Sequence, residues 1–259
     1  MIHPIGVVTH PAPDLSAPYF AETLSGLGQT IPHFLLNPST ETPVSGLLFL
    51  APGAQDPCLA RAVETGLPAV ILNGEGAGLP SMDLDNAAAA HAVVSHLLKN
   101  GGRRIALING KLETANGAAR QAGYQRALEE AGLPWDPARV ETGNFSRAGG
   151  RWAMERFLAL EESPDAVFAA NDHMALGARD VLLERGRRVP DDVLLAGFDD
   201  IPEAATAGLT TVRQPLSSMA RLAGEWLSGW IRSGRRPDPE RVRVPGELIV
   251  RSSSGPRFE

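Results

Sequence analysis

The stretch Asp165–Asp200, DAVFAANDHMALGARDVLLERGRRVPDDVLLAGFDD, holds two short apolar runs with a helix-like segment between them. The first run ends at Asn171-Asp172 and the second at Asp199-Asp200. Apolar runs without polar alternation are typical of strands that are covered on both faces, and a helix between two such strands makes them parallel. Polar residues that directly follow these strands therefore lie at the carboxyl edge of the sheet, where open parallel sheets bind ligands.

The same alternation of apolar runs and amphipathic segments extends over most of the chain. Four further runs precede this stretch: PIGVVT, GLLFLAP, PAVILN and RRIALING. Helix boundaries are marked as well, because Asp85-Asn86 can cap the segment AAAAHAVVSHLLKN and Gly101-Gly102 can end it. The sequence therefore predicts an α/β protein with parallel sheets flanked by helices.

Length and composition narrow the class of protein. The chain has 259 residues, enough for one large domain or two medium lobes, and its formal net charge of −6 argues against nucleic-acid binding by this part itself. A single cysteine, Cys58, excludes an intramolecular disulfide. The chain starts without the basic segment of a secretory signal and has no apolar run long enough to span a membrane. We therefore expect a cytoplasmic protein with no membrane contact.

The sequence makes no positive case for catalysis or metal binding. His91 and His96 are five residues apart, which does not suit a shared metal, and the glycines of NGEGAGLP (73–80) do not match a dinucleotide fingerprint. No Ser-His-Asp or Cys-His arrangement has a local motif around it. We therefore predict that the protein is not an enzyme and uses no catalytic residue, no metal and no cofactor.

Helix capping is the competing explanation for the polar residues at the strand ends, since Asp and Asn are ordinary cap residues. We expect Asp172 to cap the helix that follows it. Asp199 begins the segment DDIPEAATAG, which does not start a convincing helix. Position alone therefore leaves a structural role and a ligand role equally open for Asp199.

Several motifs, in order, carry a resemblance to a known family. Downstream of the opening stretch lie LTTVRQPLSSMARLAGEWL and VPGELIVRSSSG, and upstream lie MDLDNAAAAHAVVSHLLKNGGRRIALING and ARQAGYQRALEEAG. Together they resemble the effector-binding core of the LacI/GalR family of bacterial transcriptional repressors. The resemblance is close over Met82–Gly255 and loose before it.

The resemblance implies two Rossmann-like lobes of the periplasmic-binding-protein type, joined by three crossovers. The expected N-terminal lobe comprises residues 1–101 and 214–236, and the expected C-terminal lobe comprises residues 102–213 and 237–259. A small polar effector, a sugar or sugar derivative, is expected in the cleft between the lobes, where its binding would control DNA binding allosterically. The alternative on the same fold is a solute-binding protein of a sugar ABC importer.

The resemblance also carries over eight ligand-binding positions by motif. They are Tyr19 and Phe20 in APYFAE, Asp85 in the DN pair, Arg120 in R-x-x-G-Y, Phe145 in GNFS, Asn171 in AND, Asp199 in GFDD and Gln214 in TTVRQP. A ligand rich in hydroxyl groups suits them, because a guanidinium donates to two neighbouring oxygens, carboxylates accept from hydroxyls, and aromatic rings stack on apolar faces. The competing roles are core packing for Phe20 and Phe145, a helix cap for Asp85, and surface exposure for Arg120.

The chain departs from the family pattern in three places. The sequence starts where the family's effector-binding core starts, without the helix-turn-helix headpiece, as in a truncated core or in a natural variant; we expect operator DNA to be bound only through a headpiece absent from this chain. Only Pro38–Ser45 separates two strand candidates where the family has a helix, and Gly102 replaces the histidine of Gly-His-Arg-Arg. We still predict a homodimer held mainly by second-lobe contacts, through the helix after Asp172, which carries Val181 and Leu182, and the strand that ends at Asp199. The alternative is a partner that covers the shortened first lobe.

Overall fold

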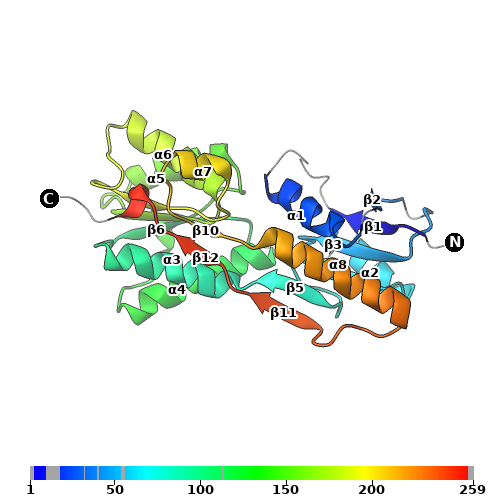
Figure 1. Cartoon of the computed structure of the whole chain (residues 1–259). Helices are drawn as coiled ribbons and strands as arrows, with labels where there is room; N and C mark the ends of the chain where they lie inside the picture. Colours follow the sequence, from blue (N-terminus) through cyan, green and yellow to red (C-terminus); the bar gives the residue numbers. More distant parts are fainter. Residues whose placement is uncertain are drawn as a thin grey trace. The chain divides into compact units, whose positions relative to one another are not determined.

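The chain folds into two compact units, each built from two separate segments. The computed structural model describes residues 3–9, 18–31, 33–39, 41–53, 56–112 and 114–255. The first unit comprises Met1–Leu84 and Pro215–Val244, and the second comprises Asp85–Gln214 and Pro245–Glu259. The chain therefore passes from one unit to the other three times, as the fold class predicted (Figure 1).

The first unit is a parallel sheet with the strand order β11-β5-β4-β3-β1-β2. Its strands are β1 (Ile5–Val8), β2 (Phe34–Leu36), β3 (Gly46–Leu50), β4 (Ala69–Leu72), β5 (Ser81–Leu84) and β11 (Arg241–Val244). Its helices are α1 (Pro18–Gly28), α2 (Pro57–Glu64) and α8 (Leu216–Ser233). Figure 1 shows β11, from near the end of the chain, beside β5.

Neighbouring residues of the central strands pack into opposite layers of the first unit. Leu48 and Val70 join the core cluster that includes residues of α1 and α8, whereas Phe49 and Ile71 join the cluster on the side of α2. All four side chains have no exposed surface. This is the burial expected of strands with apolar residues on both faces.

The second unit holds a four-stranded parallel sheet and a two-stranded antiparallel one. The parallel sheet has the order β7-β6-β8-β9, with β6 (Ile105–Asn109), β7 (Val140–Thr142), β8 (Ala166–Ala169) and β9 (Leu194–Ala196). The antiparallel pair is β10 (Thr211–Arg213) and β12 (Glu247–Ile249). The helices are α3 (Asn86–Lys99), α4 (Ala115–Glu130), α5 (Arg147–Leu158), α6 (Asp172–Glu184) and α7 (Pro202–Thr206), with short 3₁₀ turns at Pro137–Arg139 and Ser252–Ser254.

Glycines allow the helices of the second unit to pack in close pairs. A Cβ atom on Gly123 of α4 would lie 2.2 Å from the carbonyl oxygen of Ala87 in α3. A Cβ on Gly177 of α6 would lie 2.1 Å from the carbonyl oxygen of Arg147 in α5. Any larger residue at these positions would push the paired helices apart, so the backbone contact itself requires glycine.

The structure divides the chain at other residues than the sequence predicted. Helix α3 was expected in the first lobe, but it belongs to the second unit because it packs closely along α4. Strand β11 was expected in the second lobe, but it extends the first unit's sheet, with Arg241 in register with Ser81. Both differences arise from long-range packing that local sequence patterns do not encode.

Two further expectations concern the surface of the units. None of the described residues between β2 and β3 is helical, in agreement with the shortened Pro38–Ser45 segment. Val181 and Leu182 have no exposed surface and lie inside the core of the second unit, so they cannot form the dimer contact predicted for them. Their neighbour Leu183 is 50% exposed.

No helix in the described part of the chain combines the length and apolar character needed to cross a bilayer.

Candidate functional site

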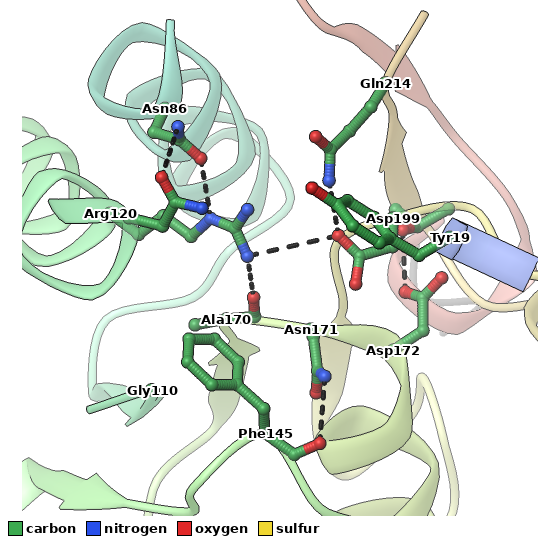
Figure 2. A network of polar contacts seen from close by, with 12 residues as sticks. Tyr19, Asn86, Gly110, Arg120, Phe145, Ala170, Asn171, Asp172, Asp199 and Gln214 are labelled. Carbon is green, nitrogen blue, oxygen red and sulfur yellow. Dashed lines mark hydrogen bonds and ion pairs between the residues drawn. The ribbon is translucent and has the colours of Figure 1, made fainter. Parts of the chain in front are cut away.

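Four of the predicted ligand residues meet at or beside the carboxyl edge of the second unit's sheet. Arg120 comes from α4, Asn171 follows β8, Asp199 follows β9, and Gln214 follows β10. Figure 2 shows Arg120, Asp199 and Gln214 in one network of polar contacts, with Asn171 beside it. The sequence motifs that contain these residues are far apart in the chain, and the parallel sheet brings them together.

Arg120 is fixed on several sides and is only 4% exposed. Its Nε atom donates to Asn86 Oδ1 at 2.9 Å, and its Nη1 atom donates to the carbonyl oxygen of Ala170. The guanidinium also lies over the ring of Phe198, 3.7 Å from the centroid. A surface role for Arg120 is therefore wrong, and its donors are held in a fixed orientation, as a recognition site requires.

Asp199 is the acidic partner of Arg120. One carboxylate oxygen accepts from Gln214 Nε2 at 2.6 Å and lies 4.0 Å from Arg120 Nη1. The backbone of Asp199 has φ +114°, a conformation that L-residues rarely adopt. Burial raises the pKa of Asp199, while Arg120, Gln214 and His173 act in the opposite direction. The strained backbone and the largely buried carboxyl group, whose side chain is 18% exposed, both fit a functional position.

Asp172 holds the turn that carries Asp199. Its Oδ2 atom accepts from the backbone N–H of Ile201 at 3.0 Å, and its Oδ1 atom accepts from the hydroxyl of Thr211 at 2.7 Å. A Cβ on Gly197 would lie 2.2 Å from Oδ1, so only glycine leaves room for this carboxyl group. Burial, and next the negative charge of Asp199, raise the pKa of Asp172 to about 8.

The capping role predicted for Asp172 is therefore wrong. Asn171 is the N-cap of α6, because its Oδ1 atom accepts from the backbone N–H of Met174 at 2.9 Å. Its Nδ2 atom donates to the carbonyl oxygen of Phe145 at 3.1 Å. A one-residue shift of the helix start frees the carboxyl group of Asp172 to bind the neighbouring turn instead.

Asp200, the second aspartate of the turn, is held by two arginines. Arg213 Nε donates to one carboxylate oxygen at 2.7 Å, and Arg251 Nη2 donates to the other at 2.6 Å. Arg251 belongs to the closing VRSSSG motif, whose Ser253 accepts from the backbone N–H of Thr210 at 2.8 Å. These contacts explain structurally why the GFDD, TTVRQP and VRSSSG motifs occur together: each fixes the others.

Phe145 lies beside the network on a backbone with φ +58°. Figure 2 shows its ring next to Gly110, and a Cβ on Gly110 would lie 1.8 Å from the ring atom Cζ. The side chain is partly buried and packs against the core of the second unit. Phe145 thus has a packing role, and ligand stacking stays a prediction.

The two residues of the DN pair, Asp85 and Asn86, have different roles. Asp85 Oδ1 accepts from the backbone N–H of Ala88 at 3.0 Å and so caps α3, as the competing reading expected. Asn86, which the sequence analysis did not select, contacts Arg120 and also donates to Asn116 Oδ1 at 3.3 Å. The sequence motif indicated the DN pair, but its second residue, Asn86, contacts Arg120 in place of Asp85.

The two candidates in the first unit lie side by side at the start of α1. The rings of Tyr19 and Phe20 meet edge to face with centroids 5.1 Å apart. The Tyr19 hydroxyl accepts a hydrogen bond from Asn73 Nδ2. Phe20 packs against the core cluster that contains residues of α1 and α8, in agreement with its competing role as a core residue.

Among the described residues, no three His, Cys, Asp or Glu side chains gather in an arrangement that could hold a metal ion. The second unit's site combines an arginine, amides and carboxyl groups, with the rings of Phe145 and Phe198 beside them. Such a set can recognise a small polar molecule through several directed hydrogen bonds.

Comparison with known proteins agrees with this reading. Residues 94–254 match the family described as periplasmic binding protein-like domain. The HTH-type transcriptional regulator CelR of Thermobifida fusca is 36% identical over 217 residues, which cover 81% of this chain and 63% of the relative. The HTH-type transcriptional repressor PurR of Escherichia coli O1:K1 / APEC is 35% identical over 216 residues, with the same coverage. This chain thus spans 63% of the length of these two relatives.

A solved structure of a transcriptional regulator, a CelR-cellobiose complex, superposes with a TM-score of 0.88 at 30% identity. The match covers 96% of this chain and 84% of that one. Two α/β units joined by three crossings, with a polar network at a sheet edge, define a periplasmic binding protein-like domain. The chain belongs to the LacI/GalR family, of which it represents this core.

Proposed function

We propose that the chain is the effector-sensing core of a LacI/GalR-type bacterial transcriptional repressor and binds a small polar ligand of the sugar class. The observation that carries the proposal is the network of Arg120, Asp199 and Gln214 at the carboxyl edge of a parallel sheet. The similarity to the solved CelR-cellobiose complex supports the choice of a sugar.

The charges around the network favour a neutral ligand with several hydroxyl groups. Asp172 and Asp199 are buried or largely buried and close enough for the charge of Asp199 to raise the pKa of Asp172. An anionic ligand would place a negative charge beside the Asp199 carboxyl group, whose pKa burial already raises, and this costs free energy in a poorly solvated site. A sugar hydroxyl can accept from an arginine and donate to a carboxylate at the same time, so one such group can bind beside both Arg120 and Asp199.

Control of DNA binding follows from a shift between conformations. Within this proposal, Tyr19 and Phe20 are the candidate ligand contacts of the first unit. A ligand that binds one conformation of the protein more tightly than the others shifts the population toward that conformation. In a homodimer that carries helix-turn-helix segments, such a shift would change the spacing of the two DNA-reading helices on an operator.

The proposal includes a cytoplasmic location and no enzymatic activity. Transcriptional regulators are the relatives found for this chain, which favours a sensor over the alternative, a solute-binding protein of a sugar importer. The sensor and the transporter would both bind sugars, so sugar binding alone does not separate them. An experiment that shows the ligand changing operator DNA binding by the same polypeptide would separate them.

The direct test is calorimetric titration of the chain with cellobiose, glucose, mannitol and, as a non-sugar control, adenine. Saturable binding of at least one sugar or polyol, with no heat from adenine, is the expected result. Bound ligand should also raise the unfolding temperature, because a hundredfold excess over the dissociation constant stabilises the folded state by about 2.7 kcal/mol. Binding of adenine alone, or of none of the four, would contradict the proposal.

A further inference from the structure

The six-stranded sheet of the first unit is covered unequally on its two faces. Residues of α1 and α8 pack on one face, whereas α2 is the only helix in the described part of the chain whose residues pack on the other. Six strands at a spacing of ~4.8 Å span about 24 Å, and a helix is only about 10 Å wide. Helix α2 packs against β3 and β4, so the sheet toward β1 and β2 needs another cover on this face.

The segment between β2 and β3 supplies part of that cover. The Pro38 ring lies directly on the sheet, since a Cβ on Gly6 of β1 would lie 2.7 Å from Pro38 Cγ and 2.8 Å from Leu47 Cδ2. No described residue of this segment is helical, so the segment covers less of the sheet than a helix would. A groove of about 430 Å³ lies between the segment and α2, with Val44 on one side and Ala62 on the other. We refer to it as the α2 groove.

The size and the lining of the α2 groove suit a small molecule with an apolar body. Small-molecule sites usually enclose ~300–1,000 Å³ and combine an apolar lining with a few polar groups. Val8 and Leu47 contribute aliphatic surface from the strands, and Leu67 contributes it from the connection between α2 and β4. Ser39 and Thr42 also line the groove, but their hydroxyl groups lie 2.8 Å apart and pair with each other. The groove therefore offers a ligand mainly apolar contacts.

Arg61 of α2 gives the α2 groove a positive charge. It is the only charged side chain in the described lining of the groove, and no described residue forms an ion pair with its guanidinium group. Arg221 of α8, by contrast, pairs with Glu225 of the same helix. A guanidinium group can hold a carboxylate through two parallel hydrogen bonds. A ligand that combines an apolar body with one anionic end therefore complements the groove.

We propose that the α2 groove is a second small-molecule site of this chain and binds a medium-chain carboxylic acid. The aliphatic chain of the ligand lies on Val8 and Leu47, and its carboxylate faces Arg61. The inference goes beyond the proposed function and does not depend on it, because every residue that lines the groove belongs to the first unit and the Arg120 network belongs to the second. Each methylene group that the groove buries should strengthen binding by up to about fourfold.

Cys58 provides a direct readout of occupancy, because it lines the groove and is the only cysteine of the chain. Burial, and next the negative charge of Asp56, raise the pKa of the thiol, so its alkylation is run at a mildly alkaline pH. The rate of alkylation by iodoacetamide is measured by mass spectrometry while octanoate is added. Octanoate at millimolar concentration should slow the alkylation in a saturable manner, and acetate, which lacks the apolar chain, should not.

Two comparisons on the unmodified chain test the apolar contact and the charge separately. Hexanoate lacks two methylene groups that the groove would bury, so it should bind ~4–16-fold more weakly than octanoate. Octanamide has the same chain length as octanoate without the charge, and it should bind about threefold more weakly. Equal protection of the thiol by octanoate and acetate, or by octanoate and octanamide, would overturn the inference.

A pair of variants tests the role of Arg61. In Arg61→Gln the preference for octanoate over octanamide should disappear, whereas the matched control Arg243→Gln, which changes an exposed arginine of β11, should keep it. Each alkylation rate is compared with that of the same variant without ligand, because the charge of Arg61 also acts on the pKa of Cys58. A wild-type rate that octanoate leaves unchanged, or a preference that survives in Arg61→Gln, would overturn the inference. Neither outcome bears on the sugar titration that tests the proposed function.

Discussion

Asp172 provides the sharpest test of the physical description of the second unit. Its carboxyl group has no exposed surface, and burial together with the charge of Asp199 raises its pKa from an ordinary 3.8 to about 8. Between these two pH values the folded chain binds a proton that the unfolded chain has lost. Stability therefore falls as the pH rises from about 4 to about 8, because the folded state binds more protons over that range.

The magnitude follows from the same two values. Each pKa unit corresponds to about 1.4 kcal/mol, so a rise from 3.8 to about 8 costs on the order of 5 kcal/mol by the time the buried group is fully charged. Asp172→Asn removes the ionisation. At about pH 5 the wild-type group is a neutral carboxylic acid that is similar in shape to the amide, so the stabilities of the two proteins should differ by no more than ~1–2 kcal/mol. Toward about pH 9 the wild type must ionise the buried group and the variant need not, so the variant should become the more stable of the two.

The assay is urea unfolding at a series of pH values, followed by tryptophan fluorescence, to which Trp135 and Trp152 of the second unit and Trp226 and Trp230 of the first all contribute. Asp192→Asn is the matched control. Asp192 is an aspartate of the same unit that pairs with Arg188, and hydrogen bonds from that arginine lower its pKa to about 2. Its effect should not change with pH above about 5, since the group stays ionised in both states. Parallel stability profiles for the wild type and Asp172→Asn would refute the reasoning.

Three further predictions concern binding, packing and assembly. Arg120→Ala should weaken the binding of a sugar at least tenfold in calorimetry, since a lost charge-assisted hydrogen bond typically costs ~1.5–3 kcal/mol. The control Arg126→Ala removes only an exposed ion pair with Glu130 on the same helix and should leave the affinity unchanged. Equal effects of the two variants would contradict the site. Gly110→Ala should lower the free energy of unfolding by ~1–3 kcal/mol, because its Cβ would lie 1.8 Å from the Phe145 ring. Gly229→Ala in α8 has no atom within 4 Å of its Cβ and should raise the free energy of unfolding by up to ~1 kcal/mol. Denaturant midpoints that move in the opposite directions would refute the packing argument. Sedimentation at micromolar concentration should give a dimer that Leu183→Arg weakens, because Leu183 is the half-exposed leucine of α6; a monomeric wild type would end that proposal.

The sequence alone determined the fold class and most of the candidate site in the second unit. Apolar runs without polar alternation predict buried parallel strands, and this signal is local, so it survives without knowledge of the tertiary structure. The positions directly after such strands predict a ligand edge, which is why Asn171 and Asp199 could be selected. Arg120 was found through its motif, and its burial between α3 and β8 became evident only in the folded chain.

Tertiary structure decided which partner each polar group chose. A cap needs only a side-chain oxygen near a helix start, so the sequence could not tell whether Asn171 or Asp172 would cap α6; the space beside Gly197 decides it. Asn86 contacts Arg120, which lies 34 residues away in the sequence, and Asn73 contacts Tyr19, which lies 54 residues away. Local sequence patterns do not reveal either contact. The division of the chain depends likewise on long-range packing, since α3 joins the second unit through α4 and β11 joins the first through β5. Local sequence patterns encode the spacing of apolar residues and the helix caps, whereas these contacts depend on which distant segments pack together in the folded chain.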